Sequence, residues 1–96
     1  LVVADTVPPT VRPLFADGAD LSRAEGLAFR LGDNFSGIAS CELYIGGEWS
    51  ICDRYPMKGT AFHPFDTPRT QSRHTVRLEA SDASGNRTVW TGMFYR

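Results

Sequence analysis

The sequence has no long apolar run and little net charge, and each shortage excludes a class of protein. No apolar stretch approaches the roughly 20 residues that a membrane-spanning helix needs. The formal net charge is −1 at pH 7, from 10 basic and 11 acidic residues, which leaves no electrostatic footprint for nucleic acid or an anionic membrane. We therefore expect no membrane span and no nucleic-acid partner. The 96 residues suffice for one domain with a single core.

Apolar residues at helical spacing are also missing, and alternation takes their place. Residues 74–80 and 88–95 both alternate between apolar and polar side chains, which is the pattern of half-buried strands. The turn cluster 82–86 (DASGN) between them predicts a β-hairpin whose three-residue loop places Gly85 in the left-handed conformation. In that register the inner face of the hairpin carries the largest rings and aliphatic side chains: Val76, Leu78, Trp90 and Phe94.

Further segments have the composition of strands, at residues 10–14, 26–31, 38–45, 48–52 and 60–63. Prolines and glycines interrupt residues 53–73, so 60–63 is the one short strand expected there, at the edge of a sheet. Short strands without helices predict an all-β sandwich of about seven antiparallel strands. Residues 1–9 are expected to be a linker, and residues 10–96 the domain.

Cys41 and Cys52 are expected to meet across a hairpin. Gly46 and Gly47 suit a two-residue turn in which both residues need a positive φ, so the following segment should fold straight back. Continued outward, that register places Cys41 opposite Cys52. Two interpretations stay open, a cross-strand disulfide in an oxidising compartment and two small buried core residues.

Metal and catalytic interpretations are weak. Cys41, Cys52, His63 and His74 are eleven residues apart throughout, without the short clip of structural zinc sites. Asp33, Asp53 and Asp82 are better explained as turn residues whose carboxylates accept backbone N–H groups than as Ca²⁺ ligands. Ser36, Ser84 and His74 supply the atom types of a hydrolase triad, but no Gly-x-Ser-x-Gly turn is present. We expect no catalytic residue, no metal ligand and no cofactor.

Three segments resemble bacterial immunoglobulin-like modules. Residues 5–11 (DTVPPTV) resemble their opening, 33–38 (DNFSGI) their B-to-C loop and 81–86 (SDASGN) their F-to-G turn. With 44–49 (YIGGEW) and the ending 93–96 (MFYR), the chain looks most like the immunoglobulin-like domain at the C-terminus of M23-family zinc metallopeptidases of Bacteroidetes.

The resemblance implies an immunoglobulin-like β-sandwich in a periplasmic, cell-surface or secreted protein. It also implies a covalently attached domain that performs the chemistry. The family's His-x-His metal motif has no counterpart here, so no catalytic residue is carried onto this chain. The cysteine pair departs from the family pattern. Because the chain starts at Leu1 rather than at methionine, we expect it to be one domain of a longer protein.

In such a sandwich the segments 38–45, 48–52, 74–80 and 88–95 share one sheet. Its outer face should be unusually apolar and rimmed by charge, a common mark of a docking surface. The expected docking residues are Tyr44, Trp49, Ile51, Arg77, Glu79, Val89, Met93 and Tyr95. Tyr44 and Trp49 can stack on a sugar, or they are a cross-strand pair that shields the backbone. In another alternative, loops from 53–73 cover this face.

The sequence therefore predicts a non-catalytic accessory domain of a cell-envelope, M23-type peptidase, which docks against or positions the catalytic domain. The alternatives are a module of a bacterial surface protein that binds a carbohydrate or a protein, or a structural spacer. The expected partners are the attached peptidase domain or another envelope protein, with glycan or peptidoglycan as the other candidates.

Overall fold

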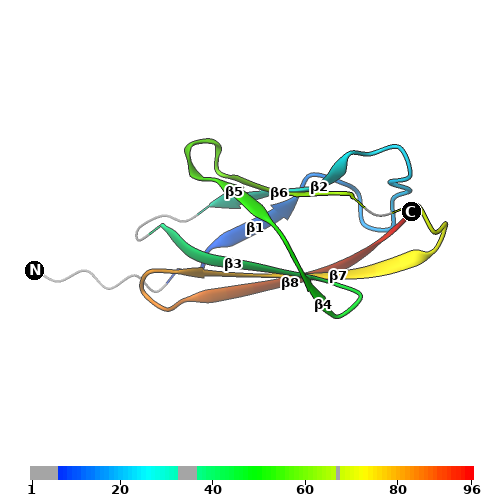
Figure 1. Ribbon diagram of the computed structural model, residues 1–96. Coiled ribbons are helices and arrows are strands. Elements are labelled where there is room, and N and C mark those ends of the chain that lie inside the picture. The colour runs from blue at the N-terminus through cyan, green and yellow to red at the C-terminus, as the bar shows by residue number, and fades with distance from the viewer. Residues whose placement is uncertain (1–6, 33–36, 67) are drawn as a thin grey trace, which may run out of the picture.

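The computed structural model describes residues 7–32, 37–66 and 68–96, and it folds them into two antiparallel sheets packed face to face (Figure 1). One sheet has the strand order β1-β2-β6-β5 and the other β4-β3-β7-β8. The strands of this described part are β1 (Thr10–Pro13), β2 (Gly26–Gly32), β3 (Ile38–Ile45), β4 (Glu48–Ser50), β5 (Asp53–Tyr55), β6 (Thr60–Pro64), β7 (Arg73–Asp82) and β8 (Arg87–Tyr95).

These orders correspond to strands A-B-E-D and C′-C-F-G of an immunoglobulin-like sandwich. The predicted fold class is therefore confirmed, with one strand more than expected in the described residues. The predicted turn over 33–36 and the beginning of the predicted linker lie outside the described residues. The boundary between linker and domain stays a prediction, although β1 begins at Thr10.

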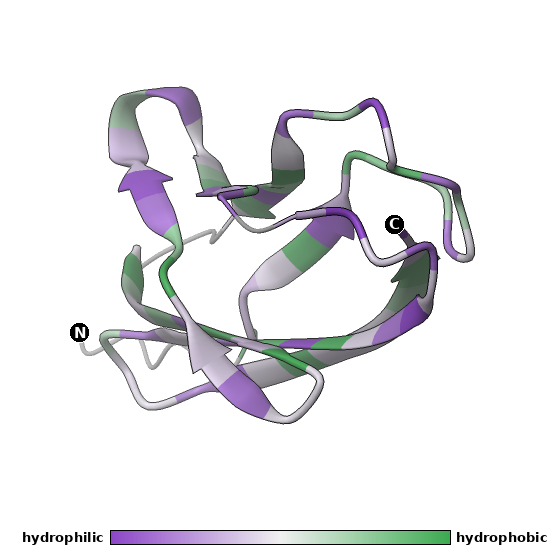
Figure 2. Ribbon diagram, turned by 45° about the vertical axis from the view of Figure 1, so that its right-hand side comes forward, coloured by the Kyte–Doolittle hydropathy of each residue, from purple (hydrophilic) through white to green (hydrophobic). Residues whose placement is uncertain are grey.

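The core lies between the sheets and follows from the alternation of the strands. Leu27 and Phe29 of β2 are completely buried, and they face Leu43 of β3 and Leu78 of β7, which are buried too. Figure 2 shows green apolar residues alternating with purple polar ones along the strands. Because neighbouring side chains of a strand point to opposite faces, each strand gives one set to the core and one to solvent.

The hairpin of β7 and β8 has the predicted register, from Arg73 opposite Tyr95 to Ser81 opposite Arg87. Gly85 has a φ of +92°, the conformation that the three-residue loop requires. Phe94 is buried as predicted, but Trp90 is only half-buried. Its indole packs edge-on against Phe15 and Phe29 with ring centroids 5.8 and 5.6 Å away, at the side of the sandwich, where part of the ring meets solvent.

The hairpin of β3 and β4 also turns where predicted, with φ values of +60° at Gly46 and +82° at Gly47. Tyr44 pairs with Trp49 in the expected register. The second strand is shorter than predicted, since β4 ends at Ser50 and not at Cys52. The chain leaves β3 there and crosses to the other sheet, where β5 pairs with β6 (Figure 1).

The prediction for residues 53–73 was wrong in two respects. β6 is not an edge strand, because it lies between β2 and β5, and β5 itself was not predicted. None of the three prolines of this region interrupts a ladder: Pro56 opens the short 3₁₀ helix η1 (Pro56–Lys58) between the strands, Pro64 is the last residue of β6, and Pro68 lies outside any strand. A proline at the end of a strand takes no donor from the ladder, so it does not confine the strand to an edge.

The two lateral edges of the sandwich differ. The outer edge of β8 is covered, because Gly18 N–H donates to the carbonyl of Met93, and Tyr95 exchanges hydrogen bonds with Ala19 and Leu21 at 2.8–2.9 Å. Near its other end, the Thr88 hydroxyl donates to the carbonyl of Pro9. The opposite edge is formed by the edge strands β4 and β5 and by the crossover between them. A covered β8 leaves this crossover and the outer sheet faces as the surfaces available to partners.

Candidate interaction surface

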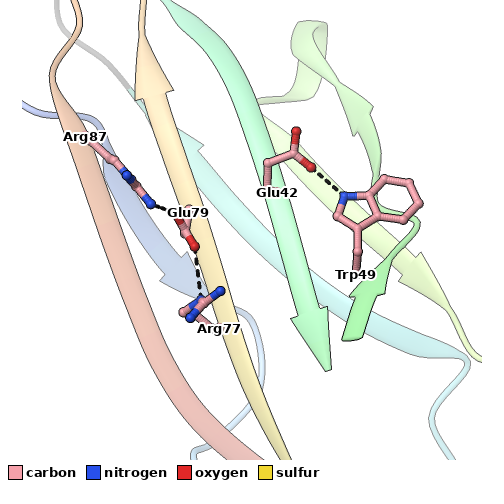
Figure 3. A network of polar contacts seen from close by, with 5 residues as sticks. All are labelled: Glu42, Trp49, Arg77, Glu79 and Arg87. Atoms are coloured by element: carbon pink, nitrogen blue, oxygen red, sulfur yellow. Dashed lines mark hydrogen bonds and ion pairs between the residues drawn. The ribbon is translucent and has the colours of Figure 1, made fainter. Parts of the chain in front are cut away.

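The outer face of the β4-β3-β7-β8 sheet brings the predicted docking residues into cross-strand rows. Trp49 of β4 lies opposite Tyr44 of β3, which lies opposite Arg77 of β7. The neighbouring row runs from Glu42 through Glu79 to Val89. Figure 3 shows the polar side chains of these rows on one side of the sheet. Residues from all four strands therefore share one surface, as predicted.

Trp49 is the most exposed aromatic side chain of this surface, at 60%. Its indole N–H donates to Oε2 of Glu42 at 2.5 Å, along a diagonal between β4 and β3 (Figure 3). A charge-assisted hydrogen bond of this kind orients the ring before any partner arrives. Glu42 was expected among the charges that rim this face, but not as the hydrogen-bond partner of Trp49. Its position two residues before Tyr44 places it on the same face of the strand as Tyr44.

Tyr44 is less available than Trp49. The guanidinium carbon of Arg77 lies 4.4 Å from the centre of the Tyr44 ring, a cation–π contact that covers one face of the ring. Tyr44 is accordingly half-buried. The two aromatic residues form a cross-strand pair in which Trp49 is the more exposed ring.

A charged ladder crosses the middle of the surface. Glu79 is held between Arg77, whose Nε lies 3.0 Å from its Oε2, and Arg87 (Figure 3). The Glu79 side chain is 14% exposed, so the two arginines largely screen its charge from solvent. This ladder separates Val89 from Trp49, and the face is therefore mixed rather than continuously apolar. Arg87 was missed by the sequence interpretation because it directly follows the turn of the hairpin.

The remaining predicted docking residues lie at the margins. Val89 and Tyr95 of β8 are 50% and 42% exposed. Met93 is half-buried, beside a side chain of the loop before β2, since Asp17 Oδ1 accepts its backbone N–H at 2.8 Å. Ile51 lies beyond the end of β4, in the crossover, where its carbonyl oxygen is 2.6 Å from Nδ1 of His63.

A shallow hollow of about 440 Å³ lies on this surface next to Tyr44 and extends over β7 towards β8. Its lining includes Tyr44, Arg73, Thr75, Arg77, Thr91 and Met93. The alternative that the segment after β4 covers this face is wrong for residues 53–64, because they form η1 and two strands of the other sheet. The hollow offers hydroxyl and guanidinium donors beside Tyr44, and Trp49 lies outside its lining.

The aspartate of the hairpin turn has the structural role that the sequence predicted. Oδ1 of Asp82 accepts the backbone N–H groups of Ser84 and Asn86 at 3.0 and 2.8 Å, and its Oδ2 accepts the side-chain amide of Asn86. Asp53 lies exposed on β5. Within residues 7–32, 37–66 and 68–96, no three His, Cys, Asp or Glu side chains gather into a metal-binding group.

Cys41 and Cys52 lie next to each other as free thiols, although Cys52 is outside the β3–β4 ladder. Their side chains are hydrogen-bonded, and both pack against the core. The hydrogen bond from Cys52 lowers the pKa of the Cys41 thiol, and the same bond together with burial raises the pKa of Cys52. The predicted pairing of Cys41 with Cys52 in the ladder is not formed, because β4 ends at Ser50, and the disulfide itself stays a prediction.

No protein-family model matches the sequence, and no curated protein matches it. Among solved structures, the chain is similar to the SrpA adhesin from Streptococcus sanguinis, with a TM-score of 0.62 and 19% sequence identity. The match covers 99% of this chain and 59% of the adhesin chain. At this identity the likeness supports the β-sandwich fold alone. No helix in the described part of the chain is long and apolar enough to cross a membrane.

Proposed function

We propose that this chain is a non-catalytic interaction module of a bacterial surface protein, and that it binds its partner through the outer face of the β4-β3-β7-β8 sheet. The observation that carries the proposal is Trp49, a 60% exposed indole whose N–H is fixed by Glu42. A structural spacer has no need to orient an exposed tryptophan. The cost of immobilising such a ring on binding is already met in the free protein, which is a source of affinity.

The polar lining of the hollow beside Tyr44 favours a polar ligand. The hydroxyl and guanidinium donors of the hollow are suited to the hydroxyls of a sugar, and Trp49, opposite Tyr44 on the next strand, offers an indole on which an apolar sugar face can stack. The fold likeness to a bacterial adhesin is compatible with a surface location. A periplasmic, cell-surface or secreted location agrees with this proposal, and the absence of chemistry in the domain is part of it.

Changing Trp49 to alanine is expected to weaken ligand binding at least tenfold, about 1.4 kcal/mol, because an exposed aromatic anchor is lost. The measurement is isothermal titration calorimetry of the isolated domain with soluble peptidoglycan fragments and a panel of bacterial and host-type oligosaccharides. Met57→Ala is the matched control, since Met57 is fully exposed and lies in η1, away from this sheet. Equal affinity of the Trp49→Ala variant and the wild type would contradict the role given to the indole.

A second form of the proposal has the partner covalently attached. Its support is the resemblance of residues 44–49 and 93–96, taken with the three immunoglobulin-like segments, to the C-terminal domains of M23-family peptidases. In this form, the outer face packs against a catalytic domain in the same protein, and no free glycan is bound. The affinity of such an interface is raised by the effective concentration of the linked domain.

Hydrogen exchange separates the two forms. If the module docks on its neighbour, amides of β4 and β8 should exchange at least about tenfold more slowly in the full-length protein than in the isolated domain, because docking suppresses local opening. Amides of β2, which lies in the other sheet, are the internal control. Identical exchange in both proteins would exclude docking on the covalent neighbour.

A further inference from the structure

The outer face of the β1-β2-β6-β5 sheet carries two arginines side by side. Arg12 of β1 lies directly opposite Arg30 of β2. Both side chains are exposed, and they point away from the core because Val11 and Phe29, their neighbours along the strands, pack against it. Like charges directly opposite each other on neighbouring strands destabilise a sheet, so this pair lowers the stability of the free protein.

No acidic residue in the described part of the chain neutralises this pair. The ion pairs found there both involve Glu79, which belongs to β7 of the other sheet. Among the strand residues of the arginines' own sheet, Asp53 of β5 is the one acidic side chain. It is separated from Arg30 by the whole of β6. The two guanidiniums are therefore available to an anion from outside the chain.

Two hydroxyl groups continue the row of the arginines across the sheet. Arg30 lies opposite Thr60 of β6, and Thr60 lies opposite Tyr55 of β5. Because neighbouring strands are about 5 Å apart, the four side chains from Arg12 to Tyr55, here called the arginine row, span roughly 14 Å. Tyr55 is 45% exposed and adds an aromatic ring at the far end. Guanidiniums bind an oxyanion through parallel N–H groups, whereas hydroxyls bind the hydroxyls of a sugar.

The neighbouring row on this face supplies apolar surface. It runs from Ala28 of β2 through Phe62 of β6 to Asp53 of β5. The Phe62 ring lies across β2, because a Cβ atom at Gly26 would come within 2.6 Å of it. A partly exposed aromatic ring beside polar donors matches a sugar, which has apolar C–H groups beside its hydroxyls. The two rows together suit a carbohydrate that carries an acidic group.

We propose that the arginine row is a binding site for an acidic oligosaccharide, in which the carboxylate or sulfate of one sugar lies between Arg12 and Arg30. The next sugar then lies over Thr60 and Tyr55. This site is on the opposite side of the sandwich from Trp49, so it is independent of the interaction surface proposed above. The bound anion also removes the repulsion between the two guanidiniums, so the ligand should raise the unfolding midpoint of the chain.

Isothermal titration calorimetry at low ionic strength tests the site with two series of ligands. Galacturonate oligosaccharides carry carboxylates, sulfated dextran oligosaccharides carry sulfates, and uncharged dextran oligosaccharides are the control ligand. Arg12→Gln and Arg30→Gln should each weaken binding of an acidic series at least about tenfold, because each removes one of two charged donors to the anion. Arg23→Gln is the matched control variant, since it removes the same charge from an exposed arginine outside both sheets.

Two further variants show how the anion is held. Arg30→Lys keeps the charge but loses the planar fork of donors, so it should retain only part of the affinity. Trp49→Ala should bind the acidic oligosaccharides as the wild type does. Without ligand, Arg12→Gln and Arg30→Gln should unfold at or above the wild-type midpoint, because each removes a like-charge contact. The same melts verify that both variants are folded.

Several results would overturn the site. They are no binding of either acidic series, equal affinity for charged and uncharged oligosaccharides, and equal affinity of the wild type and both glutamine variants. A loss of binding in Trp49→Ala but in neither glutamine variant would move the acidic sugar to the other sheet. A polyglutamate peptide that binds as tightly as the oligosaccharides would overturn the assignment of a sugar. Binding of one acidic series alone supports the site and identifies its anion as a carboxylate or a sulfate.

Discussion

Replacing Phe29 with alanine is expected to lower the free energy of unfolding by about 3–5 kcal/mol, because a large buried ring is lost and the core cannot fully close around the cavity. Phe29 is completely buried in β2. Its ring makes edge-to-face contacts with Phe15 and Trp90, at centroid distances of 5.6 Å each. Urea denaturation followed by circular dichroism measures the change, as a shift of the midpoint at constant slope.

The matched control is Met57→Ala, which removes a fully exposed apolar side chain and should change the free energy of unfolding by less than about 0.5 kcal/mol. An equally small effect of Phe29→Ala would mean that β2 is shifted by one residue, because such a slip moves every side chain to the other face.

The ring cluster offers a finer measurement. In a double-mutant cycle of Phe29→Ala and Trp90→Ala, the two changes should couple by about 0.5–1.5 kcal/mol, since each removes the partner of the other ring. Trp90 joins the two sheets through this contact, because it belongs to β8 and Phe29 belongs to β2. Coupling across the sheets distinguishes a sandwich core from two sheets that are stable separately.

Alternation and turn residues carried most of the fold prediction. The registers of the β7–β8 and β3–β4 hairpins follow from glycines that need a positive φ at defined positions, Gly85 in one turn and Gly46 and Gly47 in the other. Once a turn is placed, a period of two residues determines which side chains face inward. Turn glycines and alternation depend only on residues that are close together in the sequence, so both can be recognised from a single sequence.

What could not be predicted depends on contacts distant in the chain. β5 consists of Asp53, Arg54 and Tyr55, which have no apolar alternation, and it exists because β6 supplies its hydrogen bonds. Cys52 leaves the ladder of β3 for the same reason, since pairing with the other sheet draws the chain away after Ser50. Competition between two sheets for one segment cannot be resolved from the pattern of that segment.

The sequence predicted most of the residues of the candidate surface, but not the contacts that their side chains make with one another. Seven of its eight predicted residues belong to strands of one sheet, whereas Ile51 lies in the crossover, and long charged side chains change what the face offers to a partner. Arg77 covers Tyr44, and the ladder through Glu79 divides the apolar residues into separate groups. A long charged side chain can contact any of several neighbouring residues. The pattern of apolar and polar positions in the sequence does not determine which of them it contacts. Trp49, on the edge strand β4, is the aromatic side chain of this face that remains most exposed to solvent.

The buried aspartate of the β7–β8 turn is expected to be the second large contributor to stability. Asp82 is 3% exposed, and its carboxylate accepts two backbone N–H groups of the turn, from Ser84 and Asn86. A buried carboxylate with these donors replaces the water that the turn amides would otherwise need. It thereby stabilises the loop in which Gly85 adopts its positive φ.

Asp82→Ala is therefore expected to lower the free energy of unfolding by about 3 kcal/mol, because two partly buried N–H groups lose a charged acceptor and a hydrogen bond to a charged group contributes about 1.5–3 kcal/mol. Asp53→Ala is the matched control, since the same change at an exposed aspartate should cost less than about 0.5 kcal/mol. Urea denaturation gives both values. Hydrogen exchange of the Ser84 and Asn86 amides gives a second, local readout, and both amides should exchange faster in Asp82→Ala.

The two readouts separate a role in the turn from a general loss of stability. Asp82→Asn retains an amide oxygen that can accept an N–H group, but its NH₂ group would face the side-chain amide of Asn86, which now donates to Oδ2 at 2.9 Å. Its loss should therefore lie between those of the alanine variant and the wild type. If Asp82→Ala leaves both the denaturation midpoint and the exchange of the two turn amides unchanged, the carboxylate does not hold the turn. The loop geometry would then depend on Gly85 and on the register of the flanking strands alone.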